Sequence, residues 1–213
     1  MQMAPALKLF AGYTEIRGAY LGPAGQTSRK SARIQGREIL SCAIDLFDAE
    51  RDRFPYPDQY FELVLCCEVI EHLQRDPLHM LFEVHRVLED GGSLLITTPN
   101  CASSTSLSCI LDSTANPYIF SAYPHPERPE SDPASRHIRE YTAFELKRAV
   151  ECAGFRVEDL TTNPASWSGR DLVHDLLEEN GFPVSLRGEQ TYCLARKVAA
   201  SARIRYPEFL YTH

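Results

Sequence analysis

The sequence lacks the features that would place the protein in a membrane or outside the cell. No apolar run approaches the ~20 residues that a membrane-spanning helix needs. The N-terminus does not show the basic and then apolar order of a signal peptide. The seven cysteines form no Cys-x-x-Cys pair, and their odd number and apolar neighbours argue against a zinc site and for reduced, buried thiols. We therefore expect a cytoplasmic protein without a membrane span.

The chain also has fewer basic than acidic residues. The 213 residues hold 22 Lys and Arg against 29 Asp and Glu, which gives a formal net charge of −7. This balance argues against a nucleic acid as the main partner. The hydrophobic fraction of 44% and the charged fraction of 24% are those of an ordinary globular protein. At this length we expect a single domain that spans residues 1–213.

The rest of the chain is organised around residues 59–100. Residues 61–66 are nearly all apolar, which is typical of a strand buried on both faces. A helix with one apolar face follows, the glycines at 91–92 are expected to end it, and residues 93–98 return as a second buried strand. A strand, a crossover helix and another strand predict a βαβ unit in a parallel sheet.

The other predicted elements depend on periodicity and on capping residues. We expect helices at residues 2–11, 103–111, 142–153 and 170–180, and strands at residues 14–20, 37–47, 155–161 and 190–197. Asp76 and Thr142 are expected to cap the helices that follow them. The strand at 37–47 should lie nearer the sheet edge, and residues 22–36 and 112–136 are expected to be loops. In the helix at 103–111 the apolar residues should face inward; these are Leu107, Ile110 and Leu111.

Several of these segments resemble one known family. DAERDRFPYPDQYFELVLCCEVIEHL, VLEDGGSLLITTPN and RHIREYTAFELKRAVECAGFRVEDL are similar, in this order, to motifs of the class I S-adenosylmethionine-dependent methyltransferases, in the type 11 and type 23 branches. The resemblance implies an α/β fold: a Rossmann-like three-layer sandwich whose mostly parallel sheet has an antiparallel last strand. It covers about three-quarters of the chain, and the first β-strand of the family is missing from it.

The resemblance also assigns S-adenosylmethionine to particular positions. Asp48 would accept a hydrogen bond from the adenine amine, and Ala49 would leave room for the ring. Cys66, Cys67 and Glu68 follow a central strand, at the sheet edge where ligands of open α/β folds bind. The structural alternatives are that Asp48 only caps a turn and that the other three only pack at a strand end.

One family motif has no counterpart here. The family holds its cofactor with an acidic-x-Gly-x-Gly turn after the first strand, and no such strand and turn precede the first helix of this chain. The position that usually carries the ribose-binding acid is Tyr20, which can stack or donate one hydrogen bond but cannot offer a carboxylate. We therefore expect that the natural protein begins upstream and that Met1 is an internal methionine or a mis-assigned start.

Two histidines are candidate general bases for a hydroxyl acceptor, namely His72 and His137. The alternative for each is a capping or loop-packing histidine. Together with Glu68 and Glu71 they are similar to the metal-binding pattern of the small-RNA 2′-O-methyltransferases, so a divalent cation is a lesser alternative. Against this, E-x-x-E-H occurs widely in the family without metal, and the acidic charge makes RNA a poor substrate.

The leading hypothesis is methyl transfer from S-adenosylmethionine to a small-molecule or saccharide-type acceptor. A degenerate, non-catalytic binding domain is the alternative from another class, and an NAD-dependent dehydrogenase is excluded because the dinucleotide fingerprint is absent. Residues 101–140 are expected to form a long cover on the substrate side. The acceptor, the methylated atom and the oligomeric state cannot be inferred from these patterns.

Overall fold

A computed structural model describes residues 11–113, 116–117, 136–163, 172–198 and 203–212. Contacts divide the chain into a first unit, residues 1–57, and a second unit, residues 58–213. The single domain expected from the sequence stays a prediction. The expected helix at residues 2–11 and most of the expected loop at 112–136 lie outside the described residues.

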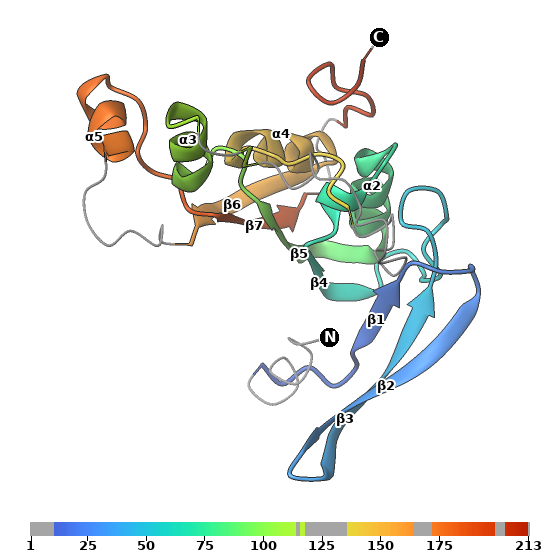
Figure 1. Ribbon diagram of the computed structural model, residues 1–213. Helices are drawn as coiled ribbons and strands as arrows, with labels where there is room; N and C mark the ends of the chain where they lie inside the picture. Colours follow the sequence, from blue (N-terminus) through green and yellow to red (C-terminus); the bar gives the residue numbers. More distant parts are fainter. Residues whose placement is uncertain (1–10, 114–115, 118–135, 164–171, 199–202, 213) are drawn as a thin grey trace, which may run out of the picture. The chain divides into compact units, whose positions relative to one another are not determined.

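The first unit contains a three-stranded sheet in the order β1-β3-β2 (Figure 1). Its strands are β1 (Arg17–Tyr20), β2 (Gln26–Ile34) and β3 (Arg37–Leu46). β3 runs parallel to β1 and antiparallel to β2. The alternating residues Leu40, Cys42 and Ile44 of β3 are buried, as the period of a strand with one covered face requires.

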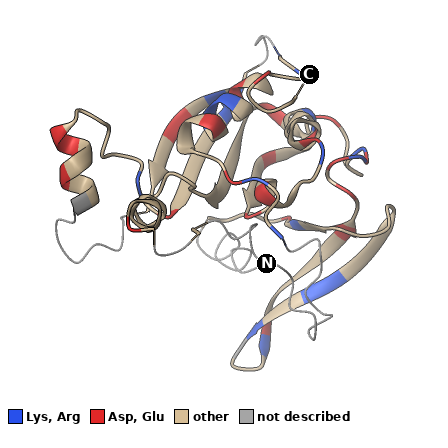
Figure 2. Cartoon of the chain, turned by 45° about the horizontal axis from the view of Figure 1, so that its top comes forward, with Lys and Arg blue, Asp and Glu red and all other residues tan. Residues whose placement is uncertain are grey.

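Two expectations for this unit are wrong. Residues 26–34 form a strand, not part of a loop, and β3 lies in the centre of its sheet, not near the edge. A hairpin turn explains both, because Gln35 (φ 49°) and Gly36 (φ 79°) have the positive φ values of a two-residue turn that joins twisted antiparallel strands. The exposed strand β2 carries Arg29, Lys30 and Arg33 (Figure 2), and such charges hinder edge pairing with another chain.

The second unit contains a four-stranded sheet in the order β4-β5-β7-β6. Its strands are β4 (Phe61–Cys67), β5 (Leu88–Pro99), β6 (Phe155–Thr162) and β7 (Gln190–Lys197). β4 pairs parallel with β5, and β7 pairs antiparallel with both β5 and β6. Three strands therefore run in one direction and the last runs against them, as expected from the sequence.

The described residues of this unit also form four α-helices and one 3-10 turn. They are η1 (Ile70–His72), α2 (Pro77–Val87), α3 (Ser104–Leu111), α4 (Ala143–Cys152) and α5 (Leu172–Glu179). α2 contacts β5, and α4 contacts β6 and β7. The predicted caps are confirmed: Asp76 accepts from His79 N, and Thr142 and Glu145 form a capping box. Among the described residues, no helix is long and apolar enough to cross a membrane.

Several details of the second unit differ from the expectation. α2 ends at Val87 and β5 begins at once, so Gly91 and Gly92 lie inside the strand and do not end the helix. β4 is not buried on both faces, since Cys66 is its only fully buried residue. In α4 the apolar Phe144 is 57% exposed.

The expectation that the apolar residues of α3 face inward is also wrong for the end of this helix. Ile110 and Leu111 are 49% and 60% exposed, while Ser104 and Ser106 are buried. The reason is a set of hydrogen bonds at the helix start, where Ser103 Oγ bonds to both the backbone nitrogen and the hydroxyl of Ser106. Polar capping has thus fixed the rotation of a short helix whose periodicity predicted the opposite.

Candidate functional site

Glu68 stands directly after β4, at the carboxyl end of the strand. Its φ of 55° is unusual for a residue with a side chain, and its backbone nitrogen donates to Thr97 O. Its Oε1 accepts a hydrogen bond from Thr97 Oγ1 at 2.8 Å and another from Gln190 Nε2. β5 and β7 therefore hold this exposed carboxylate at the sheet edge where ligands of open α/β folds bind.

The two cysteines before Glu68 differ in environment. Cys66 is buried, and its thiol lies 3.6 Å from Met80 Sδ. Burial raises the pKa of the Cys66 thiol far above its ordinary value, and burial also raises the pKa of Cys67. Both thiols are thus held in the neutral form, which is a poor nucleophile, so their expected part is to line the strand end.

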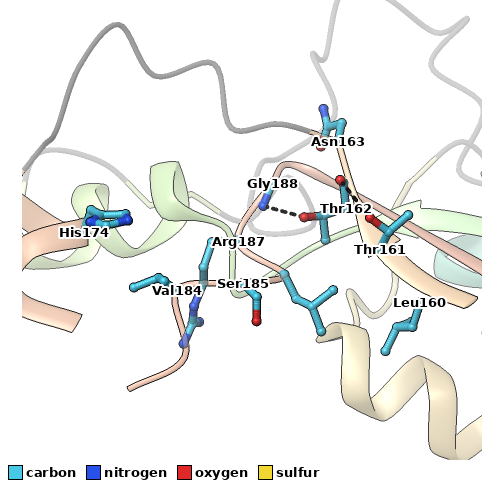
Figure 3. Close-up of a pocket in the computed structure, with 10 residues that line it drawn as sticks. Leu160, Thr161, Thr162, Asn163, His174, Val184, Ser185, Arg187 and Gly188 are labelled. Carbon is cyan, nitrogen blue, oxygen red and sulfur yellow. Dashed lines mark hydrogen bonds between the residues drawn. The ribbon is translucent and has the colours of Figure 1, made fainter. Parts of the chain in front are cut away.

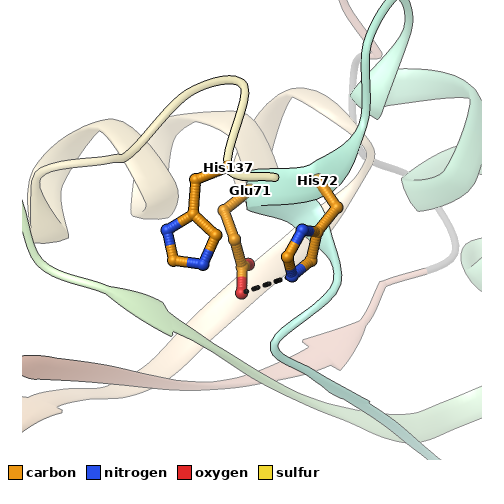
Figure 4. A group of neighbouring side chains, drawn as sticks. All are labelled: Glu71, His72 and His137. Atoms are coloured by element: carbon orange, nitrogen blue, oxygen red, sulfur yellow. Dashed lines mark ion pairs between the residues drawn. The ribbon is translucent and has the colours of Figure 1, made fainter. Parts of the chain in front are cut away.

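A compact cluster of three side chains follows in space. Glu71 and His72 come from the η1 turn after β4, and His137 comes from the segment before α4 (Figure 4). One donor atom from each residue lies within 4.8 Å of the others, and the two imidazole rings meet edge to face with centroids 4.9 Å apart. Figure 4 shows the Glu71 carboxylate between the two rings.

Glu71 is the buried centre of this cluster, with no exposed side-chain area. Its Oε2 accepts a hydrogen bond from Thr98 Oγ1 at 2.9 Å, whereas its Oε1, 3.7 Å from His72 Nε2, has no hydrogen-bond partner. Burial raises the pKa of Glu71, an effect that Glu68 reinforces and that hydrogen bonding from Thr98 and the charge of His72 oppose. A positive charge that arrives at either ring would therefore favour the ionised carboxylate.

A contact of the Nδ1 atom orients each histidine ring. His72 Nδ1 lies 3.1 Å from the carbonyl oxygen of Arg136, and His137 Nδ1 lies 3.0 Å from Glu140 Oε1. Carbonyl and carboxylate oxygens only accept, so we assign the ring proton of each neutral imidazole to Nδ1. Nε2 of both rings then carries a lone pair, as a proton acceptor or a metal ligand requires.

Backbone hydrogen bonds bring the two histidine segments together. Glu71 O accepts from Ile138 N at 2.7 Å and from Arg139 N at 3.3 Å. These bonds join the turn after β4 to the segment before α4, which are far apart in the sequence. Glu68, the fourth residue of the metal-binding set expected from the sequence, does not join the cluster. The cluster contains Glu71, His72 and His137, while the carboxylate of Glu68 is bound to Thr97 and Gln190.

The first unit has a candidate edge of its own. Tyr20 ends β1, and Asp48 follows the adjacent parallel strand β3, so both lie where parallel strands end. Asp48 Oδ1 accepts from Glu50 N at 2.9 Å, and Asp48 N donates to Asp52 Oδ2 at 2.8 Å. Asp48 therefore caps the turn that contains Ala49, and its role toward adenine stays a prediction.

A pocket of about 450 Å³ lies beside the carboxyl end of β6 (Figure 3). Thr162 Oγ1 accepts from Gly188 N, and Asn163 Oδ1 accepts from Gln190 N, across the floor of this pocket. The neighbouring Gln190 is the residue that donates to Glu68. The pocket therefore lies at the same edge of the sheet as Glu68, next to the outer strand β6.

Several of these residues belong to no motif of the sequence. Glu140 orients a histidine, Thr98 holds the buried carboxylate, and Gln190 binds Glu68. Thr98 alone had a signal, because it lies near the carboxyl end of a predicted buried strand. Glu140 and Gln190 have no pattern of their own and are found only when the chain is folded.

In open α/β sheets, ligands bind at the edge where parallel strands end, and here this edge carries acidic and imidazole groups. The sequence model of the family described as "Methyltransferase domain" matches residues 28–160. The chain therefore belongs to this family, the class I S-adenosylmethionine-dependent methyltransferases.

The chain is 33% identical over 116 residues to a protein of Mycolicibacterium smegmatis named "probable S-adenosylmethionine-dependent methyltransferase", a match that covers 54% of this chain and 37% of the relative. The chain thus spans little more than a third of this curated relative. A SAM-dependent methyltransferase from Methanosarcina mazei is similar with a TM-score of 0.48 and 13% identity, over 75% of this chain and 68% of the other. One from Archaeoglobus fulgidus has a TM-score of 0.45 and 19% identity, over 72% and 67%.

Proposed function

We propose that the protein transfers a methyl group from S-adenosylmethionine to a hydroxyl of a small-molecule or saccharide-type acceptor, and that His72 and His137 supply the general base. The observation that carries this proposal is the cluster of Glu71, His72 and His137 next to the carboxyl end of β4, in a chain of the methyltransferase family. S-adenosylmethionine supplies an electrophilic methyl group, and the protein must supply a deprotonated acceptor held in line with it.

The geometry of the cluster supports a base of this kind. Nε2 of His72 and of His137 can each take a proton, since Nδ1 of each ring is turned to a fixed acceptor. The imidazolium formed at His72 would lie 3.7 Å from Glu71 Oε1, where the buried carboxylate stabilises it. Positioned proton transfer of this type is worth ~10²–10⁴-fold in rate.

The cofactor residues proposed for S-adenosylmethionine are Tyr20, Asp48 and Ala49 of the first unit and Cys66, Cys67 and Glu68 of the second. Their chemistry fits in part. Asp48 Oδ2 is not used by the turn hydrogen bonds of this residue and faces Arg51 at 3.6 Å, so it can accept from an amine. Tyr20 is 68% exposed and offers a ring face. The chain provides no acidic-x-Gly-x-Gly turn.

The acceptor is proposed to use the pocket beside β6. Its lining combines hydroxyl and amide groups of Thr161, Thr162, Asn163 and Ser185 with the apolar Leu160. Arg187 also lines the pocket, but its guanidinium donates to the carbonyl oxygens of Pro183 and Ala102. The hydroxyl and amide groups beside an apolar wall suit a polyhydroxylated ligand.

The test is calorimetry with S-adenosylmethionine, followed by transfer of a labelled methyl group to a panel of sugars, polyols and phenols. We expect His72→Gln and His137→Gln to reduce transfer at least 100-fold while they leave binding of S-adenosylmethionine unchanged. His79→Gln is the matched control, because this histidine lies on α2, outside the cluster. Absence of any S-adenosylmethionine binding would overturn the proposal and favour a non-catalytic member of the family.

A divalent cation bound by the same cluster is a second candidate, and Glu71 Oε1 is the specific observation that favours it. This oxygen is buried without a hydrogen-bond partner, a costly arrangement. One carboxylate oxygen and two imidazole nitrogens, each braced by Thr98, Arg136 O or Glu140, form a donor set of the kind that binds zinc or ferrous iron. A cation there would bind and orient an acceptor hydroxyl.

Titration with zinc, manganese and magnesium ions, each added alone, tests this candidate without any acceptor. We expect one ion per chain, with affinity lost in Glu71→Gln and kept in Glu68→Gln, because Glu68 is bound to Thr97 and Gln190. Equal affinity in Glu71→Gln and the unaltered protein would exclude the cluster as the metal site.

A further inference from the structure

Residues 203–212, which we name the C-terminal strap, contact the helices α2 and α4. Arg203 Nη2 lies 3.1 Å from His85 Nδ1 near the end of α2, and Ile204 N donates to Cys152 O at the end of α4. Figure 1 shows the strap, in red, beside α2 and α4. The strap therefore starts between the carboxyl ends of the two helices.

The strap then reaches the beginning of α2. Arg205 Nη1 donates to Asp76 Oδ1 at 2.6 Å, and Arg205 Nη2 donates to Asp76 Oδ2, so the pair is bidentate. Tyr211 OH donates to Asp76 Oδ1 at 2.6 Å and accepts from Leu78 N at 3.4 Å. Asp76 is the residue that caps α2. It follows η1, which carries Glu71 and His72, after three intervening residues.

The same strap binds the other side of the cluster through Phe209. The Phe209 carbonyl oxygen accepts from Arg139 Nη2 at 3.3 Å, and the Phe209 ring packs under the Arg148 guanidinium at 4.0 Å. Arg139 is the residue whose backbone nitrogen donates to Glu71 O. It follows His137 at the second position, so the strap contacts both segments that carry the cluster.

The charges at Asp76 make this contact strong. Burial alone would raise the pKa of Asp76, but hydrogen bonds from Arg205 and Tyr211 outweigh it and lower the pKa. Burial and the neighbouring Asp76 both raise the pKa of Tyr211, so the phenol stays protonated and keeps its proton to donate. An ionised acceptor with a bidentate guanidinium and a phenol is a charge-assisted arrangement of fixed geometry.

We propose that Arg205, Phe209 and Tyr211 are positioning residues for the Glu71–His72–His137 cluster. They hold Asp76 and Arg139, and through these two residues they fix the spacing of the segments that bring His72 and His137 together. The proposal concerns geometry, and it depends on the proposed methyl transfer only for the use made of the two rings. A strap that merely stabilised α2 and α4 would not change the environment of the imidazoles.

Nitrogen-15 nuclear magnetic resonance of the histidine rings is the measurement, made on the full chain without any acceptor. Tyr211→Phe removes one oxygen atom and Arg205→Met removes one guanidinium. Each is expected to shift or broaden the ring signals of both His72 and His137. The matched control is Arg203→Met, which takes a guanidinium from the same strap at His85 and should leave these two signals in place.

Unchanged ring signals in Tyr211→Phe and Arg205→Met would overturn the proposal, even if both variants unfold at lower temperature. Tyr211→Phe alone decides if Arg205→Met does not fold. In the transfer assay Tyr211→Phe should lower kcat by roughly 10- to 100-fold, as misplaced reacting groups do, with KM for S-adenosylmethionine unchanged. Shifted ring signals in a protein that transfers no methyl group would support the positioning role of the strap and overturn the proposed function instead.

Discussion

The two candidate edges are held in different ways. In the first unit, Tyr20 is 68% exposed, and the hydrogen bonds that fix Asp48 come from residues within four positions of it. In the second unit, Glu71 has no exposed side-chain area, and Thr98, Ile138 and Arg139 hold it from other segments. The turn at Asp48 is thus a local structure that a short peptide pattern can specify, whereas the cluster in the second unit exists only after distant segments have packed.

This difference has an energetic meaning. Substitution of an exposed side chain usually changes the free energy of unfolding little. Substitution in a buried cluster costs more, because the cluster depends on the packing of every element around it. The following changes would break or sharpen the contrast, from the largest expected effect to the smallest.

Leu146→Ala should give the largest loss. Leu146 of α4 is fully buried in the second unit, and truncation of such a leucine costs ~2–5 kcal/mol through lost burial and the cavity that remains. Tyr20→Ala in the first unit should change the free energy of unfolding by less than about 0.5 kcal/mol, because the ring is exposed. Urea unfolding of both variants measures this, and similar losses would break the contrast.

Acid should destabilise the second unit through His85. Burial, together with the nearby charges of Arg203 and Lys197, lowers the pKa of His85 from 6.5 to about 4. The neutral ring therefore contributes stability above pH 6.5 that is lost as the pH falls toward 4, since the unfolded chain takes up the proton first. The loss is on the order of 3 kcal/mol.

His85→Gln keeps an acceptor for Arg203 and removes the titration. Its free energy of unfolding should fall less steeply than that of the unaltered protein across this pH range. Parallel curves for the two proteins would contradict a buried neutral His85.

Glu71→Gln should act in the opposite pH direction. The folded pKa of Glu71 is raised above 4.5, so the protonated carboxyl contributes stability below pH 4.5 that is lost as the pH rises through the raised value. Because glutamine does not ionise, the stability of Glu71→Gln relative to the unaltered protein should increase with pH above 4.5. Thermal unfolding at several pH values measures it, and Glu62→Gln at an exposed position of β4 is the control. A pH-independent difference would refute the assignment.

Gly36→Ala should have a small effect that is confined to the first unit. Gly36 has a φ of 79° in the β2–β3 turn, with open space where a Cβ would lie. The cost is therefore conformational, about 1 kcal/mol, and not steric. Native-state amide exchange should show it as faster exchange in β2 and β3, with the strands of the second unit unchanged. Faster exchange throughout residues 58–213 would show that the two edges are not independent.

Local signals predicted much of the fold. Asp76 and Thr142 with Glu145 specify helix starts through their own side chains, and the apolar runs of β4 and β5 specify a parallel pair. The sequence pattern does not predict the strand at residues 26–34, because a polar strand has no apolar period. It also predicts the wrong buried face for α3, because hydrogen bonding between Ser103 and Ser106 turns these serines inward. The site followed the same division: His72, Glu71 and His137 were named from a motif, but Glu140 and Thr98 were not.

The sequence by itself determined the family, the order of the strands and helices in the second unit and the E-x-x-E-H turn, because these depend on residues close together in the chain. Tertiary structure alone decided that Glu71 lies buried between two imidazoles, that Glu68 turns to Gln190, and that the C-terminal strap binds Asp76 and Arg139. The physical reason is that burial and charge pairing between distant segments have no period or spacing in the sequence. They arise only when folding brings η1, the segment before α4 and the C-terminal strap into contact with one another.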